Sequence, residues 1–446
     1  MSTQTDPTEE FELSELAVYA DKILKSTNNS VFLTGRAGTG KSTFLRKLCG
    51  EIIKQFVVLA PTGIAAIQVR GETIHSFFKL PLGPIPPGDD RLEKIKYTKE
   101  KIKLISTLDL LIIDEISMVR SDMLDAIDYC LRRIRATPKP FGGVQVLFVG
   151  DLLQLEPVTP HNDWERLEAY YTGPWFFQSQ VIAEIDLVNI ELEKVYRQTS
   201  PEFISLLDKI RAGAHSYEDM VVLNRLPSKP PHHESSYIIT LTGTRKAAAD
   251  TNNLKLSELA PDPKTYKGKL TGNFPHLPAE ERLVLKKGAQ VIFIKNDGLP
   301  FKRWVNGTLG MIEELDEDLV RVRTPDGKLL TTGATSWENI KYSVDKKGKI
   351  KEEIVGTFSQ LPLRLAWAVT IHKSQGLTFD KVSIDMGRGA FAAGQLYVAL
   401  SRSRTMEGIF LRNRLKHKDV ITSPEVLAYY DKMNDLGFIQ RILDTE

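Results

Sequence analysis

Residues 35–42 read Gly-Arg-Ala-Gly-Thr-Gly-Lys-Ser and lie between an apolar run at 31–33 and a helix-like run at 44–53. They match the pattern G-x4-G-K-[ST], in which glycines let backbone N–H groups surround a phosphate chain. A helix starting at the end of such a loop adds a dipole that favours the same anion. The sequence therefore predicts a nucleotide-binding loop between a strand and a helix.

The side chains of this loop have distinct expected roles. Lys41 is expected to reach the β- and γ-phosphates, and the Ser42 hydroxyl is expected to ligate Mg²⁺. ATP and Mg²⁺ are therefore the predicted substrate and cofactor. The residues expected to bind the nucleotide are Gly35, Gly38, Thr39, Gly40, Lys41, Ser42 and Thr43.

Three further apolar runs, at 56–60, 108–113 and 144–149, alternate with helix-like segments. Such strands predict a parallel sheet covered on both faces, and hence the α/β class. The second run leads into Asp114-Glu115, at the sheet edge where parallel strands present side chains to a ligand. We expect Asp114 to hold the Mg²⁺ water shell and Glu115 to activate the attacking water. Taken alone, two such acids are as typical of a solvated strand end.

The third run leads into Asp151-Leu-Leu-Gln154, again a strand followed by polar side chains. Gln154 is placed to sense the γ-phosphate and to report its hydrolysis, and Asp151 to hold the loop. The alternative for Gln154 is a plain surface glutamine. An Asp-Glu pair beside a phosphate loop favours a nucleoside triphosphate hydrolase over a small nucleotide kinase.

Composition excludes several classes of protein. The 446 residues are 42% hydrophobic and 26% charged, which is typical of a globular chain of about three domains. Two cysteines rule out a disulfide framework and a four-cysteine zinc site. The first 20 residues hold five acids and no Lys or Arg, unlike a targeting peptide, and no apolar run approaches membrane-spanning length. We expect a cytoplasmic protein with no membrane partner.

A first α/β stretch ends near Val188, and a second begins near Ile190. Residues 80–107 interrupt the first stretch: a proline-rich part is followed by the segment 91–105, which has six basic and two acidic residues. From Lys287 to Leu361 short strand-like runs take over, with turn signals at 325–327 and 345–349, before α/β character returns. This change predicts a small β module inserted into the second α/β part. Residues 1–10 are expected to form a flexible tail.

The motifs together resemble those of superfamily 1 helicases, in the same order. The matching runs are GRAGTGKS (35–42), APTGIAA (60–66), IIDEIS (112–117), GDLLQLEPV (150–158), YRQ (196–198), VTIHKSQGLT (369–378) and YVALSRS (397–403). Three more segments narrow the resemblance to the PIF family of RecD-like DNA helicases, superfamily 1B, between about residues 11 and 415. They are ETIHSFF (72–78), the segment 115–135, and LKKGAQVIFIKND (285–297) followed by VNGTLG (305–310).

This resemblance implies two RecA-like P-loop NTPase domains with ATP in the cleft between them. Single-stranded DNA would lie across both domains, and the motor would move 5′ to 3′. The expected divisions are a first motor domain at 11–190 with a wedge insertion at about 80–107, a second motor domain at 191–295 and 362–430, an SH3-like β insertion at 296–361, and a C-terminal tail at 431–446.

The resemblance also implies that Arg197 and Arg402 reach the cleft from the second motor domain. Each guanidinium would stabilise charge on the transferred phosphoryl group. A structural ion pair is the alternative for either arginine. Gln375 and Gly376 would line the same cleft.

Short polar groups at strand ends are expected to contact DNA phosphates without reading sequence. These residues are Thr62, Gly63, Thr73, His75, Ser76, Thr370, His372, Lys373 and Ser374, with Phe77 as a candidate for base stacking. Phe77 and Phe78 cannot both stack, and at least one is expected in the core, as is Trp367. Lys79 and the lysines of 91–103 are either fork contacts or a solvated charge run.

One departure concerns the nucleotide base. Many superfamily 1 relatives place a glutamine upstream of the phosphate loop to read adenine, and residues 11–29 contain none, so base selectivity stays open. Two alternatives to a DNA helicase also stay open: an RNA helicase of the same superfamily, and a nucleotide-switched binding module that does not unwind. The expected partners are single-stranded, forked or G-quadruplex DNA, bound by a monomeric protein.

Overall fold

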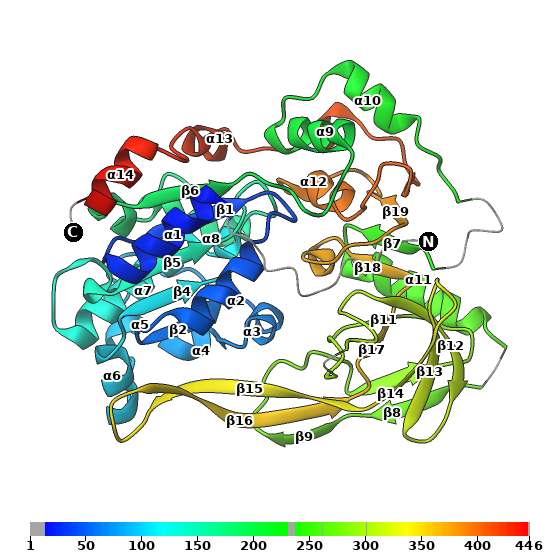
Figure 1. Ribbon diagram of the computed structural model, residues 1–446, viewed down its shortest axis with the longest axis horizontal. Coiled ribbons are helices and arrows are strands. Elements are labelled where there is room, and N and C mark those ends of the chain that lie inside the picture. The colour runs from blue at the N-terminus through cyan, green and yellow to red at the C-terminus, as the bar shows by residue number, and fades with distance from the viewer. Residues whose placement is uncertain (1–13, 231–236, 261, 300, 445–446) are drawn as a thin grey trace.

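The computed structural model describes residues 14–230, 237–260, 262–299 and 301–444. Two α/β units lie side by side, and a β-rich unit lies along one edge of both (Figure 1). The parallel-sheet α/β class predicted from the apolar runs is confirmed. The expected tail at 1–10 lies outside the described residues.

The first α/β unit is built on a six-stranded sheet of order β3-β2-β4-β5-β1-β6, in which every neighbouring pair is parallel. All the strands expected from apolar runs form. The last strand pairs with β1 as far as Leu192, so the boundary expected at residue 190 falls inside a strand. The strands are β1 (Val31–Gly35), β2 (Phe56–Ala60), β3 (Glu72–Thr73), β4 (Leu110–Ile113), β5 (Gln145–Val149) and β6 (Val188–Leu192).

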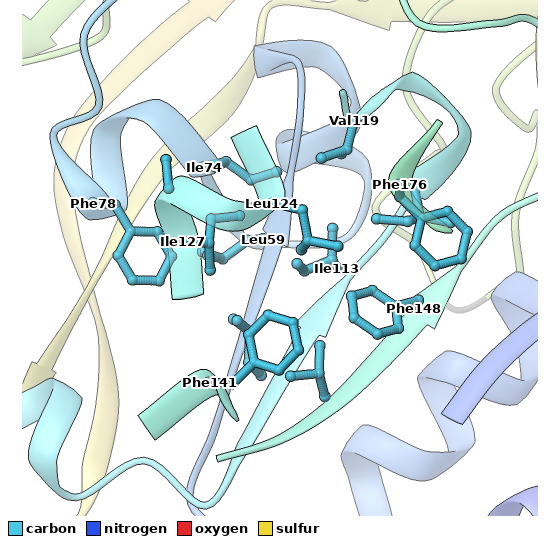
Figure 2. Close-up of a cluster of buried hydrophobic side chains, with 14 of the residues drawn as sticks. Leu59, Ile74, Phe78, Ile113, Val119, Leu124, Ile127, Phe141, Phe148 and Phe176 are labelled. Carbon is cyan, nitrogen blue, oxygen red and sulfur yellow. The ribbon is translucent and has the colours of Figure 1, made fainter. Parts of the chain in front are cut away.

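Both faces of this sheet are covered, because successive strand residues enter different cores. Leu33 packs with Ile23 and Phe44 on one face. Phe32 packs on the other, in the cluster around Phe148 that Figure 2 shows. The covering helices are α1 (Glu15–Ser26), α2 (Lys41–Glu51), α3 (Gly63–Gln68), α4 (Ile74–Phe78) and α7 (Ser121–Arg135), and the short helix α8 (His161–Trp164) has no buried residue.

The insertion expected at 80–107 forms two short helices, α5 (Asp90–Glu93) and α6 (Lys99–Ser106). Its apolar residues, such as Leu104, join the core of the first unit. Lys101 is half-buried and its Nζ lies 3.3 Å from the centre of the Phe77 ring. This lysine is therefore a packing residue, whereas most lysines of 91–103 are exposed.

The second α/β unit has a four-stranded parallel sheet of order β18-β7-β19-β20. The alternating apolar residues of 363–371 do not form one continuous strand, because β17 pairs with the β-rich unit and β18 pairs with β7. Trp367 lies between them and packs, half-buried, on the core of the β-rich unit. The elements are β7 (Ile239–Thr242), β17 (Leu363–Leu365), β18 (Ala368–Thr370), β19 (Val382–Asp385), β20 (Ile409–Leu411), α9 (Pro201–Ala212), α10 (Tyr217–Asn224), α11 (Arg245–Glu258) and α12 (Gln395–Leu400).

The β-rich unit begins earlier than residue 296, because β8 to β11 belong to it. Its five-stranded antiparallel sheet has the order β14-β13-β12-β11-β17, and the turns expected at 325–327 and 345–349 both close hairpins. Its strands are β8 (Lys264–Lys267), β9 (Lys269–Gly272), β10 (Arg282–Leu285), β11 (Gln290–Phe293), β12 (Leu309–Leu315), β13 (Leu319–Arg323), β14 (Leu329–Gly333), β15 (Thr335–Val344) and β16 (Ile350–Gln360).

The long hairpin β15–β16 reaches across to the first α/β unit (Figure 1). Tyr342 near its tip is buried in the core of that unit, where its hydroxyl accepts a hydrogen bond from the Val58 N–H at 3.1 Å. The Ile350 N–H donates to Gln55 Oε1 at 2.6 Å. The β-rich unit therefore joins the two α/β units.

The chain ends on the first α/β unit, which corrects the expected domain limits. Helix α13 (Pro424–Tyr430), expected in the second motor domain, buries Val426 and Tyr429 in the core of the first. Helix α14 (Leu436–Asp444) replaces the expected tail, because its apolar face around Ile439 packs near α1. Within the described ranges, every helix is too short or too polar to cross a membrane.

Candidate active site

The phosphate-binding loop is the turn between β1 and α2, as the motif predicts. Gly38 and Gly40 have φ of +89° and +92°, which favours glycine over other residues. A Cβ on Gly38 would lie 2.5 Å from the Cβ of Arg197, so glycine also permits a close approach of the second unit. The loop is thus shaped by its own glycines and by a contact across the cleft.

The Lys41 ammonium is turned onto this loop. Its Nζ donates to the carbonyl oxygens of Gly35 and Arg36, the latter at 3.1 Å. Burial lowers the pKa of Lys41, although the nearby carboxylates of Asp151 and Glu115 act in the opposite direction. The amine lies where the motif predicts, close to the groups that would share a phosphate with it.

Asp114 and Glu115 lie directly after β4 and are both partly buried. Burial raises the pKa of each, and the neighbouring Asp114 raises that of Glu115 further, whereas Lys41 opposes both shifts. Two close carboxylates with raised pKa values favour a bound cation. Carboxylate and hydroxyl oxygens fit Mg²⁺, which takes few protein ligands and keeps several waters. Asp114 and the exposed Ser42 would hold it.

Gln154 lies beside the same site, in the loop after β5. Its Nε2 donates to Asp151 Oδ2 at 3.0 Å, and its Oε1 accepts from Gln375 Nε2 at 3.5 Å. Gly394 of the second unit packs against the backbone carbonyl oxygen of Gln154 so closely that a Cβ on residue 394 would clash with it. The plain surface position considered for Gln154 is therefore wrong, because this side chain contacts both units.

Arg402 follows α12 and reaches the cleft from the second unit, where it is 1% exposed. Its guanidinium donates to the carbonyls of Val398, Ser374 and Leu377 and to the Ser401 hydroxyl. Burial, together with the nearby charge of Arg197, lowers the pKa of Arg402 to about 9.

Arg197 donates to the Ser401 and Gly376 carbonyls, each at 3.4 Å, and burial lowers its pKa as well. Among the residues that the structure describes, neither Arg197 nor Arg402 forms an ion pair with a carboxylate. The structural ion-pair alternative therefore has no support. Gln375 and Gly376 contact Gln154 and Arg197, at the same cleft.

The expected DNA contacts of the first unit lie at two helix starts. Thr62 and Thr73 cap α3 and α4 with their hydroxyls. Gly63 packs against His276 of the β-rich unit. Ser76 is exposed and donates to Glu72, and His75 is half-buried with a pKa lowered by burial and by Arg120.

Three of the expected DNA contacts are corrected. Phe77 and Phe78 are both 0% exposed and pack edge to face, with ring centres 4.8 Å apart, so neither can stack on a base. Ser374 is 0% exposed and donates to the Ile371 carbonyl at 2.7 Å. Thr370 is buried and its Oγ1 accepts the Lys373 N–H. These side chains shape the loops rather than face a ligand.

His372 and Lys373 remain accessible, and two arginines that the motifs did not indicate lie near them. Burial lowers the pKa of both residues, and Arg245 lowers both further, with Arg364 acting on Lys373 as well. Arg245 is the first residue of α11, after a strand and a short loop, as Lys41 is after β1. That repeated strand–loop–helix order was the available signal.

Comparisons with known proteins agree with this geometry. The family model of PIF1-like helicases matches residues 14–220, and that of the UvrD-like helicase C-terminal domain matches residues 365–406. The ATP-dependent DNA helicase Pif1 of Bdellovibrio bacteriovorus is 33% identical over 96% of this chain and 94% of its own length. Human ATP-dependent DNA helicase PIF1 is 34% identical over 93% of this chain, which spans 63% of that relative.

Solved structures show the same likeness. Pif1 from Bacteroides in complex with ADP-AlF4 is 38% identical, covers 95% of this chain and 97% of its own, and has a TM-score of 0.87. Bacteroides Pif1 bound to single-stranded DNA, with the same identity and similar coverage, has a TM-score of 0.70. Since identity and coverage hardly differ, the DNA-bound relative arranges its parts differently from this chain.

Proposed function

The chain belongs to the PIF1-like helicase family of ATP-dependent DNA helicases, and from this premise we propose that it moves 5′ to 3′ along single-stranded DNA and separates duplexes ahead of it. One observation carries the proposal. Neither Arg197 nor Arg402 has a carboxylate partner among the described residues. Arg197 approaches Gly38 of the phosphate loop, and Arg402 lies near enough to Glu115 and Asp151 for their charges to act on its pKa.

The chemistry assigned to the cleft is ATP hydrolysis. Lys41 binds the phosphates, and Ser42 with Asp114 would hold Mg²⁺, which would supply positive charge to neutralise the phosphates. Glu115 accepts a proton from the attacking water. Arg197 and Arg402 stabilise the charge that develops on the transferred group. Because these arginines belong to the other unit, binding of ATP favours a closed cleft and loss of the γ-phosphate favours an open one.

DNA is proposed to lie across both units on the side of these loops. Thr62, Gly63, Thr73, His75 and Ser76 would contact it from the first unit, and His372, Lys373 and Arg245 from the second. Such contacts address the phosphate backbone, so they bind without sequence preference. A motor that binds DNA through both units moves along the strand as the cleft closes and opens. We extend the proposed substrates to G-quadruplexes and RNA–DNA hybrids, and the proposed state in solution is a monomer.

Direction is tested on duplexes that carry a single-stranded tail at one end only. Duplexes with a 5′ tail are expected to open in the presence of ATP and Mg²⁺, because the motor loads on the tail and moves toward the duplex. Strand separation is followed by a fluorophore and quencher pair. Opening only from a 3′ tail would reverse the proposed direction, and stimulation of ATP hydrolysis by poly-U but not by poly-dT would favour the RNA alternative.

The role of Glu115 predicts the behaviour of Glu115→Gln. This variant is expected to bind ATP as the wild type does but to hydrolyse it about 10²–10⁴-fold more slowly, the usual contribution of a positioned general base. Steady-state phosphate release measures kcat, and a fluorescent ATP analogue measures binding. Glu184→Gln is the control, because Glu184 is an acid of the first unit that pairs with Arg132 of α7. Normal hydrolysis by Glu115→Gln would mean that another group activates water.

A further inference from the structure

Helix α9 belongs to the second α/β unit but also faces the first. Phe203, Leu207 and Ile210 pack in the core of the second unit, and α9 lies next to α12, the helix that precedes Arg402 (Figure 1). Asp208 points instead toward the first unit. Arg211, one turn further along α9, does the same.

The first of these residues contacts the phosphate loop. Asp208 Oδ2 lies 2.8 Å from Nη1 of Arg36, and both side chains are about one-third exposed. Arg36 lies within the loop motif, and its carbonyl oxygen accepts the hydrogen bond from Lys41. Any movement of this loop therefore moves the partner of Asp208.

The second residue contacts the loop that carries Gln154. Arg211 is 8% exposed, and its Nη2 donates to Asp151 Oδ1 at 3.0 Å. The other carboxylate oxygen of Asp151 accepts the amide of Gln154. Burial by itself would raise the pKa of Asp151, but Arg211 and Lys41 outweigh this effect and hold it low, so the carboxylate stays charged.

Arg211 also has a second carboxylate within reach. Its Nη2 lies 3.0 Å from Glu191 Oε1, yet that oxygen and Arg211 Nε, both buried, have no hydrogen-bond partner among the described residues. Arg211 Nη2 therefore contacts the carboxylates of both Asp151 and Glu191. Networks of buried ion pairs of this kind can carry coupling between sites.

We propose that Asp208 and Arg211 are positioning residues that read the state of the nucleotide, one through the phosphate loop and one through the Gln154 loop, and pass it to the second unit along α9. The two ion pairs have opposite polarity and are one helical turn apart, so α9 cannot slide by a turn and keep both. The proposal rests on the ATP-driven function proposed above, but its first test needs no DNA.

Hydrogen exchange of the α9 amides provides that test. In the wild type, adding ADP, aluminium fluoride and Mg²⁺ is expected to change the exchange rate of α9 about fivefold or more, since coupled sites typically differ by such factors. Arg211→Met is expected to lose most of this response. Lys209→Met is the matched control. This substitution removes the same charge from the same helix, but Lys209 pairs with Asp219 on the exposed side.

Two further variants guard against misfolding of Arg211→Met. Asp208→Asn alters the partly exposed pair and is expected to reduce the exchange response at least by about half, while Arg211→Lys keeps the charge and is expected to retain part of it. An exchange response equal to that of the wild type in both Asp208→Asn and Arg211→Lys would overturn the proposal. It would also be overturned if the exchange of α9 in the wild type did not change with nucleotide, or if Lys209→Met reduced the response as much as Arg211→Met.

ATP hydrolysis separates this inference from the proposed function. The ratio of kcat with poly-dT to kcat without DNA, measured in the same variant, is expected to fall about tenfold in Arg211→Met. An unchanged stimulation would count against the coupling role. If the wild type shows no stimulation while α9 still responds to the nucleotide, the proposed DNA motor fails and the role of α9 stands.

Discussion

Replacing Lys41 with alanine is expected to abolish ATP hydrolysis and strand separation while the protein stays folded. The phosphate-loop motif has two positive side chains, Arg36 and Lys41. Because the Arg36 guanidinium pairs with Asp208, the Lys41 amine is the one that can bind the phosphates. Among the described residues the Lys41 amine donates only to carbonyls of the loop, and burial lowers its pKa. The fold therefore loses little when the amine is removed.

The measurements are phosphate release at saturating ATP and the melting temperature. Lys47→Ala is the matched control, because Lys47 is exposed on the same helix, α2, and lies outside the loop. Turnover near that of the wild type in Lys41→Ala would refute the assigned role. A large fall in melting temperature would mean that Lys41 holds the loop together rather than the nucleotide.

Arg402→Ala is expected to lower kcat by about 10³–10⁵, the range for an arginine that stabilises a transferred phosphoryl group. Binding of a fluorescent ATP analogue should change far less, because the effect is confined to the transition state. Arg402→Lys is expected to stay strongly impaired, since a lysine cannot reproduce the planar set of donors.

The matched control is Arg404→Ala, two residues further along the chain. Arg404 is exposed and pairs with Asp380, so its loss should leave kcat within a few fold of the wild type. Since Arg402 is buried, circular dichroism of each variant must show a folded protein first. A folded Arg402→Ala with normal kcat would leave Arg197 as the arginine that completes the site.

The motifs predicted the first α/β unit well because their signals are local. A continuous apolar run, two glycines in the left-handed region and a lysine at a helix start lie within a dozen residues around Gly38, so neighbouring residues specify the turn. The hairpin turns at 325–327 and 345–349 are equally local. The division of 363–371 into two strands is not local, because β17 and β18 pair with strands that are far away in the chain.

The expected DNA contacts show the same limit. Phe77 occurs in a short helix whose pattern fits a base-stacking residue as well as a core residue, and only packing against Phe78 and the hairpin β15–β16 settles its burial. Val426 and Ile439 likewise lie in the cores of the first unit, although the sequence predicts a second motor domain and a tail there, because nothing near them in the sequence shows that the chain returns.

The amino-acid sequence was sufficient for the form of the phosphate loop, because a strand, a glycine turn and a helix start need only neighbouring residues to form. The sequence was not sufficient to predict which residues from distant segments pack against that loop. The approach of Arg197 to Gly38 and the two ion pairs of α9 join residues more than 50 positions apart. Such distances are set by the packing of two cores against each other, and only the folded chain contains them.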